Sequence, residues 1–163
     1  MSSIPKISTI LYSTDLGENT RPVFRHAISQ ARKNEAHIVM VHVVEPLSEA
    51  AISVINTFLS HDDTEKAHKN TIKDVLEVMQ KRLEAFCSDE LDAANVNSSR
   101  VKEILVVGGH PSEQILRVAK ERNADMIVMG RSTRSLLGNT IMGSTVRRVT
   151  KHAPVPVLVV PND

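Results

Sequence analysis

Apolar residues occur along this chain in short uninterrupted runs, which alternate with longer segments where they recur every three or four positions. The runs are typical of strands buried on both faces of a parallel sheet, and the periodic segments are typical of helices with one buried face. The runs predict five strands, at residues 7–13, 37–44, 101–107, 126–129 and 155–160. Helices are predicted between them at 20–34, 64–88, 110–123 and 143–151. This order indicates an α/β fold, with a parallel sheet covered by helices on both faces.

Two connecting segments are less regular. Residues 47–63 form a longer connection than most strand–helix loops, and Leu47, Ala51 and Phe58 fall at helical spacing within it. We therefore expect part of this segment to be a short amphipathic helix, which could act as a lid, cover the dimer side, form a partner groove or belong to the core. Residues 88–100 are polar and predict turns.

Composition restricts the classes of function. A length of 163 residues suits a single domain, 1–163, and a net charge of +1 creates no strong field toward nucleic acid or anionic membranes. Three Phe, one Tyr and no Trp leave few rings on which bases could stack. No apolar run reaches membrane-spanning length and the start has no apolar targeting segment, so we expect a cytoplasmic protein. Cys87 lies in a helical pattern and is expected to be a packed thiol.

The strongest candidate for a binding site lies between residues 125 and 148. An apolar run ends at Gly130, and a loop leads to a helix that starts with small residues. The loop carries Arg131 and Arg134, and the helix start carries Gly143, Ser144 and Thr145. Unpaired N–H groups in the first turn of a helix attract anions, although the spacing matches neither the P-loop nor the dinucleotide motif. In the alternative interpretation, Gly130 only ends a strand and Ser144 only caps a helix.

Histidines and the other arginines favour structural roles. A glutamate and two histidines near one face of a predicted helix lack the HExxH spacing, so a solvated helix start outweighs a metal site there: His61, Glu65 and His68. His42 in a strand and His110 at a turn are expected to be packed or hydrogen-bonded rather than catalytic. Arginines occur at 131, 134, 147 and 148, but no nucleic-acid-binding signature accompanies them.

The last predicted strand, from Val155 to Val160, contains Pro156. An interior proline is tolerated mainly at the edge of a sheet, and a bare apolar edge favours aggregation. Pairing of this strand with the same strand of a second copy would remove the hazard. We therefore expect a homodimer through this strand, unless a loop or the N-terminus covers the edge.

Five pieces of the chain, in order, resemble the universal stress protein family. They are residues 10–15 (ILYSTD), 42–43 (HV), 109–112 (GHPS), 124–130 (ADMIVMG) and 143–160, which ends in HAPVPVLVV. The resemblance spans nearly the whole chain. It implies a doubly wound, five-stranded parallel sheet of order 3-2-1-4-5, similar to adenine nucleotide alpha hydrolases, and usually a dimer.

One branch of that family binds ATP through the motif G-x2-G-x9-G-[ST]. Gly130, Gly143 and Ser144 match it, whereas Thr133 stands at the second glycine and Ser13 stands where ATP binders commonly have proline. A β-branched threonine resists positive φ and close approach to phosphate, but it adds a hydroxyl group next to two arginines. The chain thus resembles the ATP-binding branch with a degenerate motif.

Ligands of doubly wound sheets bind beyond the carboxyl ends of the strands where the strand order reverses, which places Asp15 opposite Gly130. By resemblance, Asp15 and Val43 hold the adenosine, while Gly130, the loop after it and the helix start hold the phosphates. The implied nucleotide-binding set is Ser13, Thr14, Asp15, Val43, Met129, Gly130, Arg131, Thr133, Arg134, Gly143, Ser144 and Thr145. The alternative role for Asp15 is to cap a helix or turn.

These features predict a dimeric sensor or adaptor that binds ATP or AMP, with Mg²⁺ as a companion ion, and signals to a protein partner. The sequence offers no paired metal carboxylates and no positioned base, so hydrolysis is expected to be slow at most. Two other functions stay open. One is a dimeric interaction protein in which Thr133 has abolished nucleotide binding, and the other is a small hydrolase or nucleotidyl-transferring enzyme.

Overall fold

The computed structural model describes residues 3–17, 19–58, 61–131 and 142–162. Five strands form one parallel sheet in the order β3-β2-β1-β4-β5, which confirms the predicted fold. The strands are β1 (Thr9–Thr14), β2 (His37–Val44), β3 (Val101–Gly108), β4 (Met126–Gly130) and β5 (Val157–Val160). Each strand lies within two residues of its predicted position, because long apolar runs leave little choice of where a buried strand can sit.

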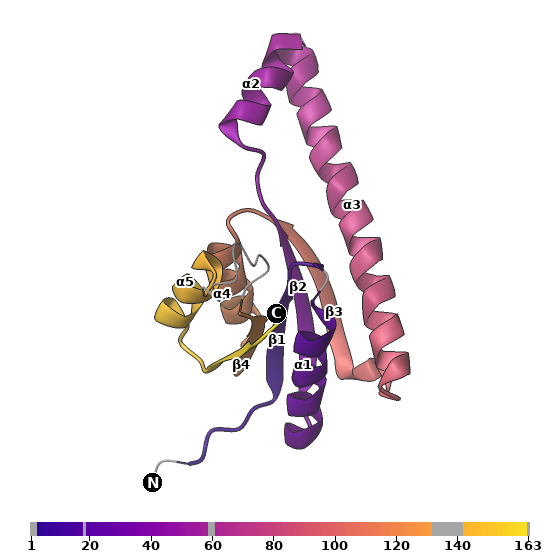
Figure 1. Cartoon of the computed structure of the whole chain (residues 1–163), viewed down its shortest axis with the longest axis vertical. Helices are drawn as coiled ribbons and strands as arrows, with labels where there is room; N and C mark the ends of the chain where they lie inside the picture. The colour runs from indigo at the N-terminus through magenta and orange to yellow at the C-terminus, as the bar shows by residue number, and fades with distance from the viewer. Residues whose placement is uncertain (1–2, 18, 59–60, 132–141, 163) are drawn as a thin grey trace.

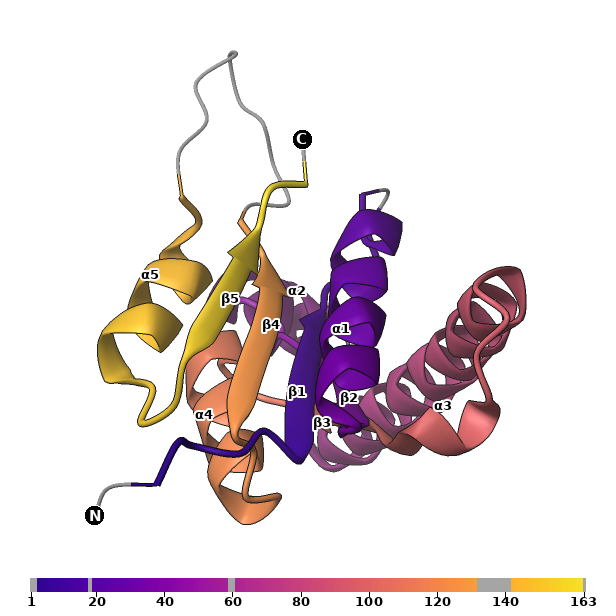
Figure 2. The same cartoon turned by 90° about the horizontal axis from the view of Figure 1, so that it is seen from below.

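Helices cover both faces of the sheet (Figure 1). The chain forms α1 (Arg21–Asn34), α2 (Glu49–Phe58), α3 (His61–Ala93), α4 (Pro111–Glu121) and α5 (Ser144–His152). Helices α1 and α3 lie on one side of the sheet, and α4 and α5 lie on the other (Figure 2). Successive residues of β1 point to opposite faces, so Tyr12 packs with Phe24 of α1 while Leu11 joins the core under α4 and α5.

Helix α3 extends to Ala93, so the prediction of turns from residue 88 was wrong for its first part. Leu83, Cys87 and Leu91 continue the buried face through this region. Glu90 is also buried, with only 2% of its side chain exposed, and it pairs with Arg21 and Arg25 of α1 at 3.3 and 3.2 Å. A buried carboxylate is tolerated where cations neutralise it, and these cations come from a distant part of the sequence.

The connection between β2 and α3 contains the expected short helix, α2. Helix α2 and the first part of α3 lie beyond the carboxyl ends of the strands, away from the body of the sheet (Figure 1). Val54 of α2 is 58% exposed, and Val78 of α3 is 55% exposed. Of the roles left open for residues 47–63, a place in the core therefore does not hold for Val54.

Strand β5 begins at Val157 instead of Val155, so Pro156 lies before the strand and not within it. Its carbonyl oxygen accepts the Ile127 N–H at 2.9 Å, a contact in which the missing N–H of proline has no cost. Strand β5 is nevertheless an edge of the sheet, as the proline had indicated. In the part of the chain that the structure describes, every helix is too short or too polar to cross a membrane.

Two carboxylates fasten the amino-terminal end of the sheet. Asp125, just before β4, accepts the N–H groups of Ser8 and Thr9 at 2.8 and 2.9 Å through one oxygen. Glu103, near the start of β3, makes a two-pronged pair with Arg122 at 2.6 and 2.8 Å. Hydrogen bonds from this guanidinium lower the pKa of Glu103. These contacts fix the entry of β1 and the end of α4 relative to the sheet.

Candidate functional site

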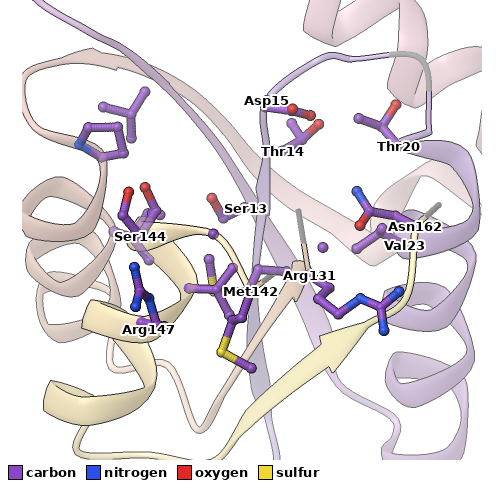
Figure 3. A pocket seen from close by; sticks show the side chains of 18 of the residues that line it. Ser13, Thr14, Asp15, Thr20, Val23, Arg131, Met142, Ser144, Arg147 and Asn162 are labelled. Carbon is purple, nitrogen blue, oxygen red and sulfur yellow. The ribbon is translucent and has the colours of Figure 1, made fainter. Parts of the chain in front are cut away.

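A cavity of about 520 Å³ lies at the carboxyl ends of the strands. It sits where β1 and β4 are neighbours, which is the point where the strand order reverses. Its walls come from the ends of β1, β2 and β4, the starts of α1, α4 and α5, and the C-terminal tail (Figure 3). Doubly wound sheets bind ligands in this position.

Ten of the twelve residues expected to bind nucleotide line this cavity. They are Ser13, Thr14, Asp15, Val43, Met129, Gly130, Arg131, Gly143, Ser144 and Thr145. The other two, Thr133 and Arg134, lie outside the described residues. The fold thus brings together segments that are more than one hundred positions apart in the sequence.

The loop after β1 is held by short-range hydrogen bonds. Thr14 Oγ1 accepts the Leu16 N–H and Asp15 Oδ1 accepts the Gly17 N–H, both at 3.1 Å. Leu16 has a φ of 58°, a left-handed conformation that is uncommon for such a side chain and is kept here by its neighbours. Asp15 therefore does cap a turn, yet it stays exposed and lines the cleft. The two interpretations of Asp15 are compatible.

The half-buried His42 and the buried Tyr12 support this loop through hydrogen bonds. His42 Nδ1 lies 2.8 Å from the Thr14 carbonyl oxygen, which can only accept, so the proton resides on Nδ1. This confirms the hydrogen-bonded role expected for His42. The Tyr12 hydroxyl donates to the Thr20 carbonyl at 3.3 Å, and burial raises the pKa of this phenol. Tyr12 is therefore a neutral, fixed part of the cavity wall.

A side chain at the first motif glycine, Gly130, would force the side chain of Asn162 to shift. A Cβ atom at this position would lie 2.7 Å from Nδ2 of Asn162 and 3.3 Å from a methyl carbon of Val23. Asn162 itself is buried, with 8% exposed, and lines the cavity. The absence of a side chain at Gly130 therefore makes room for the C-terminal tail, independently of any ligand.

Packing does not explain why the last motif residue, Gly143, is a glycine. Its φ of −58° is open to any residue, and a Cβ there would meet only the Arg131 carbonyl oxygen, at 3.5 Å. Gly143 is the N-cap of α5, so the idea that Ser144 caps this helix was wrong, and no side chain caps it. Ser144, Thr145 and Val146 begin α5, where N–H groups have no carbonyl partner within the helix, and all three line the cavity.

Charges are distributed unevenly around the cavity. Asp15 and Glu45 follow β1 and β2, whereas Arg131 and Arg147 lie at the end of β4 and in the first turn of α5. Figure 3 shows Arg147 next to Ser144, while the side chain of Arg131 extends in the opposite direction, to the side of Val23 and Asn162. Of these two arginines, Arg147 is the one that lies beside the helix start.

Sequence reasoning missed several lining residues. Arg147 was noticed only as part of a basic group, although its position three residues after Ser144 places both on one helical face. Asn162 gave no signal, because it follows a proline in a short tail. Glu45, Thr20, Val23 and Met142 also line the cavity and were not predicted as site residues.

The remaining candidates outside the cavity are structural or not described. Cys87 is 4% exposed, which confirms a packed thiol, and this burial raises its pKa to about 11. His61, Glu65 and His68 lie in α3, but their side chains are not among those that the structure describes. Among the residues that are described, no group of three or more His, Cys, Asp or Glu side chains could hold a metal ion.

The fold and the cleft define a doubly wound α/β domain with a ligand-sized site at its switch point. Residues 6–161 match the model of the universal stress protein family, and the chain therefore belongs to that family. It is 27% identical over 154 residues to universal stress protein MJ0577 of Methanocaldococcus jannaschii, with 93% of each chain covered. A Thermus aquaticus universal stress protein is 27% identical over 152 residues, covering 93% of this chain and 97% of that one.

Solved structures agree with this family. The structure of MJ0577 has a TM-score of 0.71 at 25% identity and covers 98% of this chain and 99% of its own. A universal stress protein solved in complex with cAMP has a TM-score of 0.61 at 23% identity, covering 98% of this chain and 100% of its own. The second likeness establishes the fold alone. Family and fold, as the resemblance implied, are confirmed.

Proposed function

We propose that the cleft binds an adenine nucleotide, ATP or AMP, as the regulatory ligand of a dimeric sensor or adaptor. The observation that carries this proposal is the convergence of ten sequence-predicted residues on one cavity of about 520 Å³. This volume lies within the usual range for small-molecule sites. A family member of the same fold was solved with the nucleotide cAMP, which supports this ligand class.

The polarity of the cavity supports one orientation of the ligand. Phosphate would rest on the first-turn amides of α5, next to Arg147, where the helix end carries partial positive charge. Adenosine would lie toward Asp15 and Val43, where a carboxylate can accept hydrogen bonds from hydroxyl or amino groups. In this orientation ATP enters with Mg²⁺ as its counterion. Slow hydrolysis is the most that we expect.

Arg131 supports a route for signalling to a second subunit. Its carbonyl oxygen accepts the Gly143 N–H at 3.1 Å, and its own N–H donates to the Val160 carbonyl of β5 at 2.9 Å. A ligand at Gly143 would therefore act on one end of this link, and Val160 of β5 lies at its other end. We propose that β5 forms the homodimer edge and that nucleotide shifts the population of conformations there. A monodisperse monomer by light scattering, with and without ATP, would contradict the dimer.

A second candidate function rests on the exposed apolar side chains beyond the sheet. Val54, Ile72 and Val78 are 58%, 41% and 55% exposed on α2 and α3. Apolar side chains that stay exposed on a helix can serve as contacts for a protein partner. An interaction protein that binds no nucleotide would need these exposed side chains and not the cleft.

The direct test is to denature purified protein, search for released adenine nucleotide by chromatography, and titrate the apo protein with ATP and AMP by calorimetry. Gly143→Asp should weaken binding at least about tenfold, because its carboxylate would face the phosphate. Gly143→Asn has nearly the same shape without the charge and is the matched control. Aspartate and asparagine are both favourable N-caps, so both variants should fold.

Three outcomes separate the candidate functions. Heat of binding that is lost in Gly143→Asp and largely kept in Gly143→Asn supports the nucleotide sensor. Absence of both released nucleotide and binding heat in the unmodified protein would contradict it and favour the interaction protein. Steady release of inorganic phosphate from ATP would favour an enzyme.

A further inference from the structure

We infer that Arg147 makes the cleft selective for nucleotides with two or more phosphates over nucleoside monophosphates. This inference rests on the proposed function and assigns a specificity-determining role to one residue of the same site. Arg147 lines the cavity from the first turn of α5. It stands outside the G-x2-G-x9-G-[ST] motif, which ends at Ser144.

The position of Arg147 relative to the helix start carries the inference. Its N–H donates to the Gly143 carbonyl at 3.1 Å, so the residue lies one turn after the N-cap. Ser144 and Arg147 are three positions apart and therefore share a helical face. Their Cα atoms differ by about 4.5 Å along the helix axis, from a rise of about 1.5 Å per residue. Figure 3 shows the Arg147 guanidinium on the side of Ser144.

This arrangement provides two successive anion-binding elements. The amides at the start of α5 can hold one phosphate, and the guanidinium, which carries five donors in a planar fork, can hold the next one. A monophosphate would occupy the amides alone and leave Arg147 in water. A diphosphate or triphosphate would occupy both elements, so the extra affinity from Arg147 should appear only for polyphosphates.

The other described arginines nearby do not offer the same geometry. The side chain of Arg131 extends toward Val23 and Asn162, away from Ser144 (Figure 3). Arg148 is the next residue after Arg147, but it is absent from the cavity wall, because adjacent helical positions point about 100° apart. Arg148 is exposed, as Arg147 is, and lies in the same helix. It is therefore a matched control for the loss of one positive charge.

The experiment is a calorimetric titration of the whole chain with ATP, ADP and AMP, at low and at physiological salt. Variants Arg147→Gln, Arg147→Lys and Arg148→Gln are compared with the unmodified protein. In Arg147→Gln the affinity for ATP and ADP should fall about tenfold, while that for AMP stays within about twofold. Arg147→Lys should recover part of the loss, since it keeps the charge without the fork. Arg148→Gln should leave all three affinities within about twofold.

The ratio of ATP affinity to AMP affinity decides whether Arg147 determines the selectivity. An equal loss of affinity for ATP and AMP in Arg147→Gln would overturn the inference. So would an Arg148→Gln variant whose affinities for ATP and ADP fall as far as those of Arg147→Gln. Either result would leave the proposed nucleotide site intact. Failure of the unmodified protein to bind any of the three nucleotides would overturn both the proposed function and the selectivity. Thermal melts of the three variants check that each is folded.

Discussion

The two ends of the sheet use the same kinds of side chain for different purposes. At the amino-terminal end, Asp125 accepts two backbone N–H groups, and Glu103 is fully engaged by Arg122. At the carboxyl-terminal end, Asp15 accepts a single local N–H and stays exposed to the cleft. The helix that begins there, α5, has no side-chain cap.

The difference indicates that one end of the sheet contributes mainly to stability and the other mainly to binding. Polar groups at the amino-terminal end are used to fasten elements to each other, so their loss should destabilise the fold and spare the ligand. At the carboxyl-terminal end, the Asp15 carboxylate accepts only a local N–H, so its loss should affect the ligand first. Gly130 is an informative exception, since it lies in the cleft but serves packing.

Asp125→Ala should have the largest effect on stability. The change removes the acceptor of the Ser8 and Thr9 N–H groups, one of which is exposed and one part-buried. We expect a loss of about 3 kcal/mol in the free energy of unfolding, measured by urea denaturation. Asp125→Asn keeps one acceptor oxygen and should lose less. An Asp125→Ala variant of normal stability with weakened ATP binding would contradict the assignment of stability to one end of the sheet and binding to the other.

Gly130→Ala should cost about 2 kcal/mol of unfolding free energy, because the new methyl group would overlap the Asn162 side chain. Asn162→Ala in the same chain should recover much of that loss, which a double-mutant cycle can measure. If Gly130→Ala and the double variant lose the same free energy of unfolding, contact with Asn162 is not the reason for a glycine at this position.

Asp15→Ala should change unfolding free energy by less than about 1 kcal/mol, since it removes only an exposed hydrogen bond to the Gly17 N–H. Its affinity for ATP should nevertheless fall about tenfold through loss of an acceptor for adenosine. Calorimetry and urea denaturation on the same preparation separate the two effects. A large loss of stability with unchanged affinity would reduce Asp15 to a turn cap.

Glu103→Gln should have the smallest effect, visible mainly as a change in pH dependence. Hydrogen bonds from Arg122 lower the pKa of Glu103 in the folded state, so this pair stabilises the fold above the unfolded carboxyl pKa of about 4.3. The stabilisation is lost as pH falls through the lower folded pKa. Both side chains are about one third exposed, at 34% and 35%, which limits the effect to less than about 1 kcal/mol.

Urea denaturation at neutral and at acidic pH measures this small effect. The unmodified protein should lose more stability on acidification than Glu103→Gln does. An identical loss in the two proteins would show that the ion pair contributes no net stability.

The strands and their order could be predicted because buried apolar runs and family motifs are local signals. The end of α3 could not, since Glu90 continues the buried face only with Arg21 and Arg25 of α1 beside it. The start of β5 was misplaced because Pro156 offers a carbonyl to Ile127, a contact that sequence alone does not reveal.

The candidate site was predictable where the motif gives residues directly, as at Asp15, Gly130 and Ser144. Asn162 approaches the cleft only through the path of the folded tail beyond β5. Arg147 could have been found from helical spacing, but its place in the cleft depends on the orientation of α5. Sequence analysis thus left out the residues that reach the cleft only through the arrangement of distant elements.

If the carboxyl-terminal end of the sheet binds nucleotide while the amino-terminal end holds the fold together, ATP should perturb only the first of these ends. Amide chemical shifts of isotope-labelled protein, recorded during titration with Mg²⁺-ATP, distinguish the two ends residue by residue. We expect shifts at Asp15, Gly130 and the first turn of α5, with the amides of Thr9 and Asp125 unchanged. Saturating ATP that leaves the α5 amides unmoved, or that moves only the amino-terminal end, would contradict it.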